Sequence, residues 1–445
     1  MSALARPSSQ AIDRNAPVEH VPVDLLRVFA MWLPLAASFE LMAVEGPSLQ
    51  AVVGRLPHPE LNLAAWGLTI GLSLLVESPV IMLLATSIAI VSDGHAFRVL
   101  RRFTLGLCVA CTILTALLSF TPLYGFVTAT LMRQPLDIRQ AARPALQIML
   151  LWTAAIGYRR FYQGVLVRYG YASRVSYGTV FRLTSILTVA LLMVWTGRFS
   201  GVVAAALAIM SGVITEATAT RLFARVAVRE VQAHPSTGDS LTLRAVLRFH
   251  GPLAATTLLT LLVEPLNSAA LAWLPQARIT LAAWPVAFMS VFIIRGLSFP
   301  LQETAVALAT RSDGRRALHR FTRWVGVVTS ILLAVLAFTP LLHVYLVKLL
   351  DTPPVLLPFV RTAVGLCVLQ PFFTATGAFN RGVLMAFHRT GDVYRGMGAS
   401  LLAQIVLLVL LVRLGWPGMW VAALSSSGST LIEYLWLRRC ASRLC

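Results

Sequence analysis

Charge is scarce in this sequence. Only 12% of its 445 residues are charged, whereas 57% are apolar; a soluble domain of average composition carries about 25% charged residues. The shortage excludes a soluble enzyme of one or two domains, a disordered chain and a coiled coil. Together with the mean hydropathy of +0.76, it indicates a polytopic membrane protein.

Cysteine and histidine are too few and too scattered to build a metal centre. Cys108 and Cys111 form a C-x-x-C within an apolar stretch, with no second pair to complete a zinc site. The eight histidines include no two at a metal-binding spacing. We therefore expect no bound metal and no other cofactor. Clusters of acids or histidines at one interface, which an integral transferase needs, are also missing, so we expect no enzyme.

Twelve stretches are apolar and long enough for a helix to cross a bilayer, which takes roughly 20 residues. A β-barrel needs alternating segments, and apolar runs such as 405–412 do not alternate. No loop is long enough to hold a soluble domain. The sequence predicts an all-α membrane protein with helices at 25–52, 62–91, 103–130, 144–167, 175–196, 200–224, 245–273, 280–309, 321–349, 355–387, 393–413 and 417–437.

Basic residues are distributed unevenly between the predicted loops. The two ends and the alternate loops between them hold 26 of the 37 lysines and arginines, and the other six loops hold nine. By the positive-inside rule we expect both termini in the cytoplasm, and the protein in the cytoplasmic (inner) membrane. The net charge of +19 then favours membrane lipids rather than nucleic acid as partners. Residues 1–23 are polar, which predicts a disordered cytoplasmic tail.

An internal repeat relates the two halves at an offset of 218 residues. One match would be noise in so apolar a chain, but several fall in the same register. The tripeptide Ser92-Asp93-Gly94 recurs at 312–314, after a two-residue insertion that is soon undone. The other matches pair 34–37 with 252–255, 63–66 with 281–284, 120–123 with 338–341, and 164–166 with 382–384.

Each repeat holds six predicted helices, so both halves enter the membrane from the same side. We expect an N-lobe (24–225), a cytoplasmic linker (226–243) and a C-lobe (244–445), related by a pseudo-twofold axis along the membrane normal. Secondary transporters are commonly built in this way, with the substrate near the midplane between the lobes. We expect a monomer that works by alternating access.

Ionisable residues inside spanning helices are costly and often mark pathways or relays. Glu45 and Glu264 occupy the first helix of each repeat, one residue out of register, and each lies within two positions of a proline. Proline bends a spanning helix and frees backbone carbonyls. We expect Glu45, Glu264 and Asn267 to take up a coupling cation or proton. The alternative is an interfacial glutamate with no such role.

Glu77 and Arg295 are counterparts in the repeat and have opposite charges. Symmetry-related positions near the lobe interface can face each other, so one hypothesis is a salt bridge that closes the transporter. Another makes Arg295 an anion-binding residue, because the guanidinium fork suits carboxylate and phosphate. A static buried pair is the third. Arg182, within a helix, and Arg381, at the end of one, are further candidates for substrate binding or gating; Arg381 could also anchor its helix in the headgroups.

Several short motifs resemble the multidrug/oligosaccharidyl-lipid/polysaccharide (MOP) flippase superfamily. They are the paired Pro-Leu-Ala-Ala starts of helices 1 and 7, and the Gly382-Val383-Leu384 motif with a trailing Arg389-Thr390. Within this superfamily the sequence is most similar to the progressive ankylosis (Ank) family, through Pro252-Leu253 with Glu264 and Leu266-Asn267, through Trp284-Pro285-Val286 with Met289, and through the stretch from Phe321-Thr322 by way of Thr339-Pro340 to Arg381-Gly382.

The resemblance implies a twelve-helix fold like that of the multidrug and toxic compound extrusion (MATE) proteins. It also implies export of small anions such as pyrophosphate, nucleotide triphosphate or citrate. In MATE relatives, acidic residues of helices 1 and 7 take part in cation coupling, and Glu45 and Glu264 match them here. The chain lacks the charged C-terminal tail of animal Ank proteins and an aspartate in helix 1. The coupling ion, proton or Na+, therefore stays open.

The sequence thus predicts an ion-coupled secondary transporter, an antiporter that exports a small organic or phosphate-containing anion. Within the same superfamily, a flippase for a lipid-linked saccharide and a multidrug exporter are the alternatives. The major facilitator class shares the plan of six helices twice, but its full Asp-Arg-x-Gly-Arg loop motif is missing after Ser92. A membrane-embedded enzyme or a scaffold is the alternative from another class.

Overall fold

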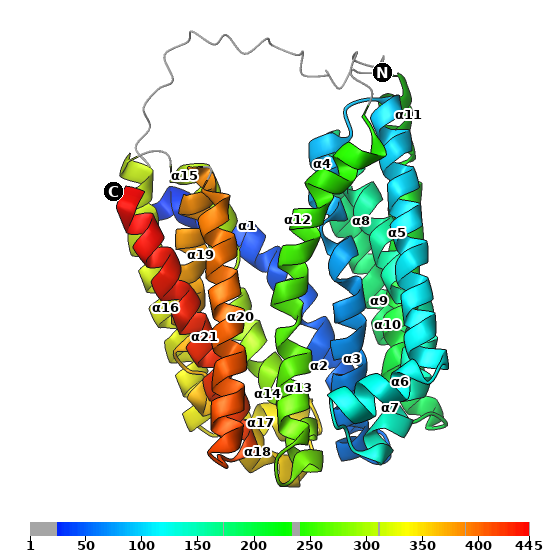
Figure 1. Ribbon diagram of the computed structural model, residues 1–445, viewed down its shortest axis with the longest axis vertical. Helices are drawn as coiled ribbons and strands as arrows, with labels where there is room; N and C mark the ends of the chain where they lie inside the picture. Colours follow the sequence, from blue (N-terminus) through cyan, green and yellow to red (C-terminus); the bar gives the residue numbers. More distant parts are fainter. Residues whose placement is uncertain (1–24, 172, 234–240, 310–311, 388, 445) are drawn as a thin grey trace, which may run out of the picture.

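The computed structural model describes residues 25–171, 173–233, 241–309, 312–387 and 389–444, and within these ranges all regular structure is helical (Figure 1). The predicted tail 1–23 lies outside them. The helices group into twelve rods at the positions of the twelve predicted spans. Eight rods are long and apolar enough to cross a membrane, and a ninth is a pair of helices, Pro354–Leu366 and Gln370–Ala386, bent by 43°. The chain is a multi-pass membrane protein.

The first six rods follow the chain from α1 to α10. They are α1 (Leu25–Ala43) with α2 (Glu45–Gly54); α3 (Pro59–Ile81) with α4 (Leu83–Ile90); α5 (Gly94–Phe120) with α6 (Leu123–Gly125) and η1 (Phe126–Leu131); α7 (Leu136–Ile148) with η2 (Met149–Leu151) and α8 (Trp152–Arg168); α9 (Ser173–Thr196); and α10 (Gly201–Phe223).

The last six rods repeat this pattern after α11 (Arg225–Ala233). They are α12 (Leu243–Leu261) with α13 (Val263–Ala272); α14 (Ala277–Gly296) with α15 (Leu301–Leu308); α16 (Ser312–Phe338) with α17 (Leu341–Val344) and η3 (Tyr345–Leu349); η4 (Pro354–Leu356), α18 (Leu357–Leu366) and α19 (Gln370–Ala386); α20 (Thr390–Arg413); and α21 (Gly418–Ala441) with η5 (Ser442–Leu444).

The repeat is visible in the helix boundaries themselves. α5 and α16 both have 27 residues and both end at a phenylalanine before a Thr-Pro, 218 residues apart. The breaks in rods 1 and 7 fall at Val44 and Leu262, also 218 residues apart, beside the predicted bends at Pro47 and Pro265. Two lobes with the same internal plan result, and Figure 1 shows them side by side.

The first halves of rods 1 and 7 are exchanged between the lobes. α1 packs against α14, α15 and α16 of the C-lobe, whereas α12 packs against α3, α4 and α5 of the N-lobe. In Figure 1, blue α1 accordingly starts among the C-lobe helices, and green α12 starts beside the N-lobe. The predicted division at residues 24–225 and 244–445 follows the repeat, but each lobe is completed by one helix from the other half.

One pair of matching hydrogen bonds fixes the exchanged helices. The indole N–H of Trp32 in α1 donates to the carbonyl of Leu297 at 3.0 Å, and Nε2 of His250 in α12 lies 2.7 Å from the carbonyl of Pro79. Both pairs are related by the offset of 218. Each carbonyl lies at the break between two helices of one rod, where the missing helical turn frees backbone acceptors. We call these two contacts the latches.

The predicted linker 226–243 begins with a helix that sequence reasoning missed. Helix α11 continues from α10 and packs against α5 and α8, with Ala227, Val228 and Val231 buried. Its apolar positions were hidden among charged residues in a short segment. We refer to the end of the molecule that carries α11 and the starts of α1 and α12 as the terminal end, and to the opposite end as the distal end.

Candidate functional site between the lobes

The two lobes contact each other at the distal end. Gln50 of α2 donates to the carbonyl of Pro285 in α14 at 2.9 Å, and Gln134 donates to the carbonyl of Ser268 in α13 at 3.0 Å. At the surface, Asp137 forms an ion pair with Arg278 of the other lobe. In Figure 1 the lobes lean together here and diverge toward the terminal end. The conformation is closed at the distal end.

A cavity of about 80 Å³ lies at the interface just inside this closure. Symmetry-related Trp66 and Trp284 line it, together with Glu264 and Phe288. Gly67 of α3 sits so close to the Pro285 ring that a side chain there would collide with it. Close packing of α3 on α14 therefore leaves room for a few water molecules, and not for an organic solute.

Four charged residues form a buried network inside the N-lobe. Glu216 in α10 binds Arg159 of α8, and its carboxylate also lies 3.4 Å from Arg182 of α9. Arg182 bridges on to Glu45 of α2 at 2.6 Å. Gln163 donates to the second oxygen of Glu216 at 3.2 Å. Two acids and two arginines are thus brought together, and their charges cancel.

Glu77 belongs to the same lobe and accepts a hydrogen bond from the Trp152 indole at 2.7 Å. No ion pair within 4 Å joins it to Arg295 among the described residues. The predicted salt bridge between these repeat counterparts is therefore not formed in this conformation. The reason is that each side chain is directed into contacts of its own lobe, Glu77 toward Trp152 and Arg295 toward Phe299.

Arg295 lies on a different kind of surface. In α14, Phe288, Phe292, Arg295 and Phe299 share one helix face, and the ring centroids of Phe288 and Phe292 are 5.8 Å apart. The Arg295 guanidinium stands over the Phe299 ring at 5.6 Å. Its Nε is buried without a hydrogen-bond partner, and none of the described acids lies within ion-pair distance. Arg295 is a cation without an anion.

Glu264, at the start of α13, is equally without an ionic partner. Its Oε2 accepts from the Trp284 indole at 3.0 Å, while its Oε1 is buried and unbonded. Asn267 is fully buried one turn later; its Oδ1 accepts from Gln404 at 2.7 Å, and its Nδ2 has no hydrogen-bond partner. Of the three predicted coupling residues, Glu264 therefore lines the interface, Asn267 lies behind it, and Glu45 is held by Arg182.

Arg381 is engaged within the C-lobe. It binds Glu433 of α21 and donates to Gln302 of α15 at 3.2 Å. Next to it, Gly382 lies against the Gln302 backbone so closely that no side chain would fit. The geometry resembles a tie between three helices of one lobe, with Arg381 already neutralised by its carboxylate partner.

Sequence reasoning did not place Glu40 at the site. It packs against Gly296, beside Arg295, because the exchange carries α1 into the C-lobe; a Cβ at Gly296 would lie only 2.6 Å from Glu40 Oε1. That oxygen is buried without a hydrogen-bond partner. The position of Glu40 in the apolar stretch was visible from the sequence, but its neighbours depend on the exchange, which the sequence pattern does not show.

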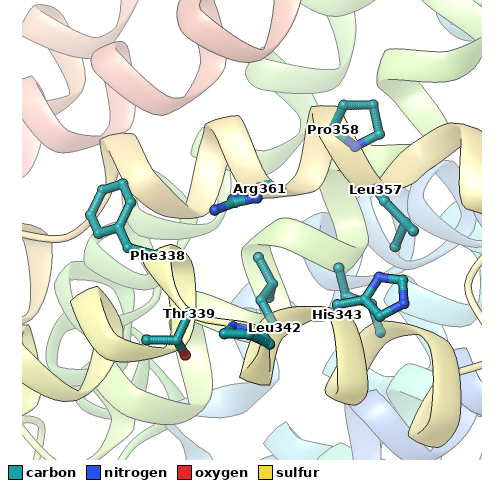
Figure 2. Close-up of a pocket in the computed structure, with 9 residues that line it drawn as sticks. Phe338, Thr339, Leu342, His343, Leu357, Pro358 and Arg361 are labelled. Atoms are coloured by element: carbon teal, nitrogen blue, oxygen red, sulfur yellow. The ribbon is translucent and has the colours of Figure 1, made fainter.

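A larger cavity of about 520 Å³ lies away from the interface, at the distal end of the C-lobe. Figure 2 shows Arg361 on the upper helix facing Leu342 and His343 on the lower one. In the N-lobe the position of Leu342 is held by Tyr124, which is buried and has the Arg143 guanidinium over its ring at 5.6 Å. The cavity is thus the space of a missing tyrosine, on one lobe only.

Solved structures define the class of fold. An inward-facing multidrug resistance MATE family transporter of the MOP superfamily has a TM-score of 0.65 at 14% identity, covering 95% of this chain and 99% of that chain. The eukaryotic MATE transporter AtDTX14 has 0.60 at 15%, covering 95% and 100%. The lipid II flippase MurJ, in an inward closed conformation, has 0.65 at 12%, covering 92% and 87%. The chain has the MATE fold.

No family model and no curated protein matches the sequence.

Proposed function

We propose that the protein is a secondary active transporter that exports a small organic or phosphate-containing anion by alternating access. Three observations on the page support it: the MATE fold, the repeat of two lobes, and a closure at one end only. The substrate class follows from the charge at the interface and agrees with the resemblance to Ank proteins. In this proposal Arg295 binds the anion and Glu264 takes up the coupling proton or Na+.

The single observation that carries the assignment is the unpaired state of Arg295 and Glu264. Buried charges in proteins are normally paired, and the N-lobe obeys this rule with its network of Glu45, Arg182, Glu216 and Arg159. At the interface a cation and an acid are left without ionic partners. An anionic solute would supply the partner of Arg295, and a proton or Na+ that of Glu264.

The orientation completes the proposal. The basic loops of the sequence lie at the terminal end, which we place in the cytoplasm. The closed distal end then faces outward, so the structure represents an inward-facing state that loads substrate from the cytoplasm. Rocking of the lobes about the α3–α14 contact would open the distal end and release the anion.

The test is the flux of labelled citrate and pyrophosphate through the purified protein in liposomes, with and without a pH or Na+ gradient. We expect gradient-driven flux that falls at least about tenfold in Arg295→Ala, because each lost charged hydrogen bond costs about 1.5–3 kcal/mol. Glu264→Gln should uncouple flux from the gradient. The control is Arg361→Ala in the distal cavity of the C-lobe (Figure 2), which should stay within twofold of the unmodified protein.

Flux that survives in Arg295→Ala, or falls equally in Arg361→Ala, would remove Arg295 from the site. Coupling that survives in Glu264→Gln would move the coupling role to Glu40, the other acid at the interface with an unbonded carboxylate oxygen. Absence of flux for both anions, from protein with an intact melting transition, would contradict the substrate class.

A lipid-linked anion is the second candidate substrate. The flippase MurJ matches as well as the MATE structure, with a TM-score of 0.65 for both. Arg295 would suit the pyrophosphate of a lipid-linked saccharide as well as it suits a soluble anion. Transbilayer movement of a fluorescent pyrophosphate-linked lipid in the same liposomes separates the two candidates. A multidrug exporter would instead move organic cations and depend on Glu264 but not on Arg295.

A further inference from the structure

A cavity of about 620 Å³ lies at the terminal end of the C-lobe, between α16, α19 and α21. Its rim is cationic and its floor is apolar. The rim includes Arg316, Arg320 and Arg438, all exposed, and the floor is made of Phe379, Val383 and Phe387 of α19. No Asp or Glu is among the described residues that line it. Unlike the candidate transport site, this cavity lies within one lobe.

The N-lobe shows what normally fills this place. The counterpart of Asn380, which lines the cavity, is Tyr162, and it is 2% exposed. Its ring lies 4.9 Å from Phe161 and 6.4 Å from Phe97. The counterpart of Phe97 in the C-lobe is Arg315, whose guanidinium donates to the carbonyl of Leu444. Two aromatic rings in one lobe therefore correspond to an amide and a guanidinium in the other.

The N-lobe is also covered at this point. Helix α11 packs against the start of α5 and against α8, and Tyr171 binds Glu230 of α11 at 2.5 Å. In the C-lobe, α21 is followed by the short η5 within the described residues. The C-lobe thus keeps the basic end of the ninth rod but loses the two elements, rings and covering helix, that close the space in the N-lobe.

The surroundings of the cavity face lipid. Trp324, one turn from Arg320 in α16, is 59% exposed, and Leu435 in α21 is 50% exposed. An aromatic residue next to a cluster of arginines is typical of the membrane–water interface. Basic pockets between helices at that level suit anionic lipid headgroups. The apolar floor would meet the start of the acyl chains.

We propose that this cavity binds the phosphate headgroup of an anionic phospholipid of the same leaflet. Arg316, Arg320 and Arg438 neutralise the phosphodiester, and Asn380 supplies an uncharged donor where the N-lobe has a tyrosine ring. Phe379 and Val383 contact the glycerol backbone and the first methylenes. The lipid takes the place that aromatic side chains and α11 take in the N-lobe, so it completes the packing of the C-lobe.

The experiment compares the binding of phosphatidylglycerol, phosphatidylcholine and free glycerol phosphate to the full-length protein in detergent, by native mass spectrometry with a lipid titration. We expect phosphatidylglycerol to bind at least about tenfold more tightly than phosphatidylcholine. The triple variant Arg316→Ala/Arg320→Ala/Arg438→Ala should reduce that preference to less than about twofold, because each arginine near a membrane surface contributes to anionic lipid binding.

The repeat offers a matched control. Arg98, Arg101 and Arg102 are exposed at the same end of α5, and their triple alanine variant removes the same charge from the filled lobe. It should leave the preference for phosphatidylglycerol unchanged. Equal losses in both triple variants would show a general effect of surface charge and overturn the proposal. Glycerol phosphate that binds as tightly as phosphatidylglycerol would also overturn it, because the site would then serve a soluble anion.

A substitution that fills the cavity tests the proposal without removing charge. Asn380→Tyr introduces the ring that the N-lobe carries at Tyr162. We expect at least about tenfold weaker binding of phosphatidylglycerol with an unchanged or raised melting temperature in lipid-free detergent. Full retention of the lipid by a folded Asn380→Tyr variant would contradict the assignment of the cavity as the binding place.

Discussion

The two lobes share one backbone plan and differ in how their interior charges are paired. In the N-lobe, Glu216 lies against Arg159 and Arg182, and its carboxylate is 1% exposed. In the C-lobe, the Arg381–Glu433 pair is partly open, with side chains 22% and 18% exposed, and Arg295 has no acid partner. The N-lobe is built as a neutral, closed unit, and the C-lobe leaves charge and space for ligands.

This difference teaches that a repeat divides work between its copies. Aromatic rings fill the N-lobe at Tyr124 and Tyr162, and the C-lobe has Leu342 and Asn380 at these places, each beside a cavity. The same helices therefore serve as scaffold in one half and as binding surface in the other. The following predictions test whether this contrast is real, from the largest expected effect to the smallest.

The largest effect is expected from the N-lobe network. Glu216→Ala leaves Arg159 and Arg182 buried without their shared carboxylate, and removal of one partner from a buried ion pair costs about 3–5 kcal/mol. The matched change in the C-lobe, Glu433→Ala, frees only the partly exposed Arg381 and should cost about 1 kcal/mol or less. The measurement is the melting temperature of both purified variants in the same detergent.

Equal shifts in the two variants would break the comparison, since the lobes would then be equally dependent on their ion pairs. A further control sharpens it: Arg295→Ala removes a cation that has no acid partner. We expect that variant to melt at or above the temperature of the unmodified protein, while losing anion flux.

An intermediate effect is expected at the latches. His250→Phe and Trp32→Phe each remove a ring N–H from a carbonyl at a helix break, and a buried acceptor left unsatisfied costs about 1–3 kcal/mol. If the latches stabilise the state closed at the distal end, each variant should shift the ratio of the two conformations by about threefold to thirtyfold. Spin labels at positions 102 and 320, on matching helices of the two lobes, report the distance between the lobes.

Exchange of the two latch residues refines this prediction. His250→Trp keeps a ring N–H that can donate to Pro79, so it should shift the conformations less than His250→Phe does. The His250 contact is expected to matter more than the Trp32 contact, because Nδ1 of His250 also lies 2.8 Å from the Thr86 hydroxyl. Unchanged distances in all three variants would show that the latches persist throughout the cycle.

Much of this architecture could be predicted from the sequence because hydropathy and the repeat are local signals. All twelve spans coincide with helical rods, and the bends appear beside Pro47 and Pro265. The partners of individual charges could not be predicted. Whether Glu77 meets Arg295 or Trp152 depends on helix rotation within a lobe, and the contact of Glu40 with Gly296 depends on the exchange of α1. Neither has a signature in composition or spacing.

The smallest effect is expected at the recurring Ser-Asp-Gly tripeptide. Asp93 caps α5: its Oδ1 accepts from the backbone N–H groups of His95 at 2.8 Å and Ala96 at 3.0 Å. These hydrogen bonds, the one from Ala96 first, lower the pKa of the Asp93 carboxyl below its ordinary value. The tripeptide therefore starts a helix, which explains why the major facilitator loop motif around it is incomplete.

Because the folded pKa of Asp93 is depressed, its charge stabilises the fold at every pH above the unfolded value of about 3.9 and loses this effect as the pH falls through and below that value. Asp93→Ala should cost about 1 kcal/mol, and Asp93→Asn, which can still cap the helix, only a few tenths. The melting difference between the unmodified protein and Asp93→Asn should stay constant from pH 7 to pH 5 and shrink below about pH 4. A difference that grows on acidification would mean that Asp93 is held protonated, and the tripeptide would then need a role other than capping.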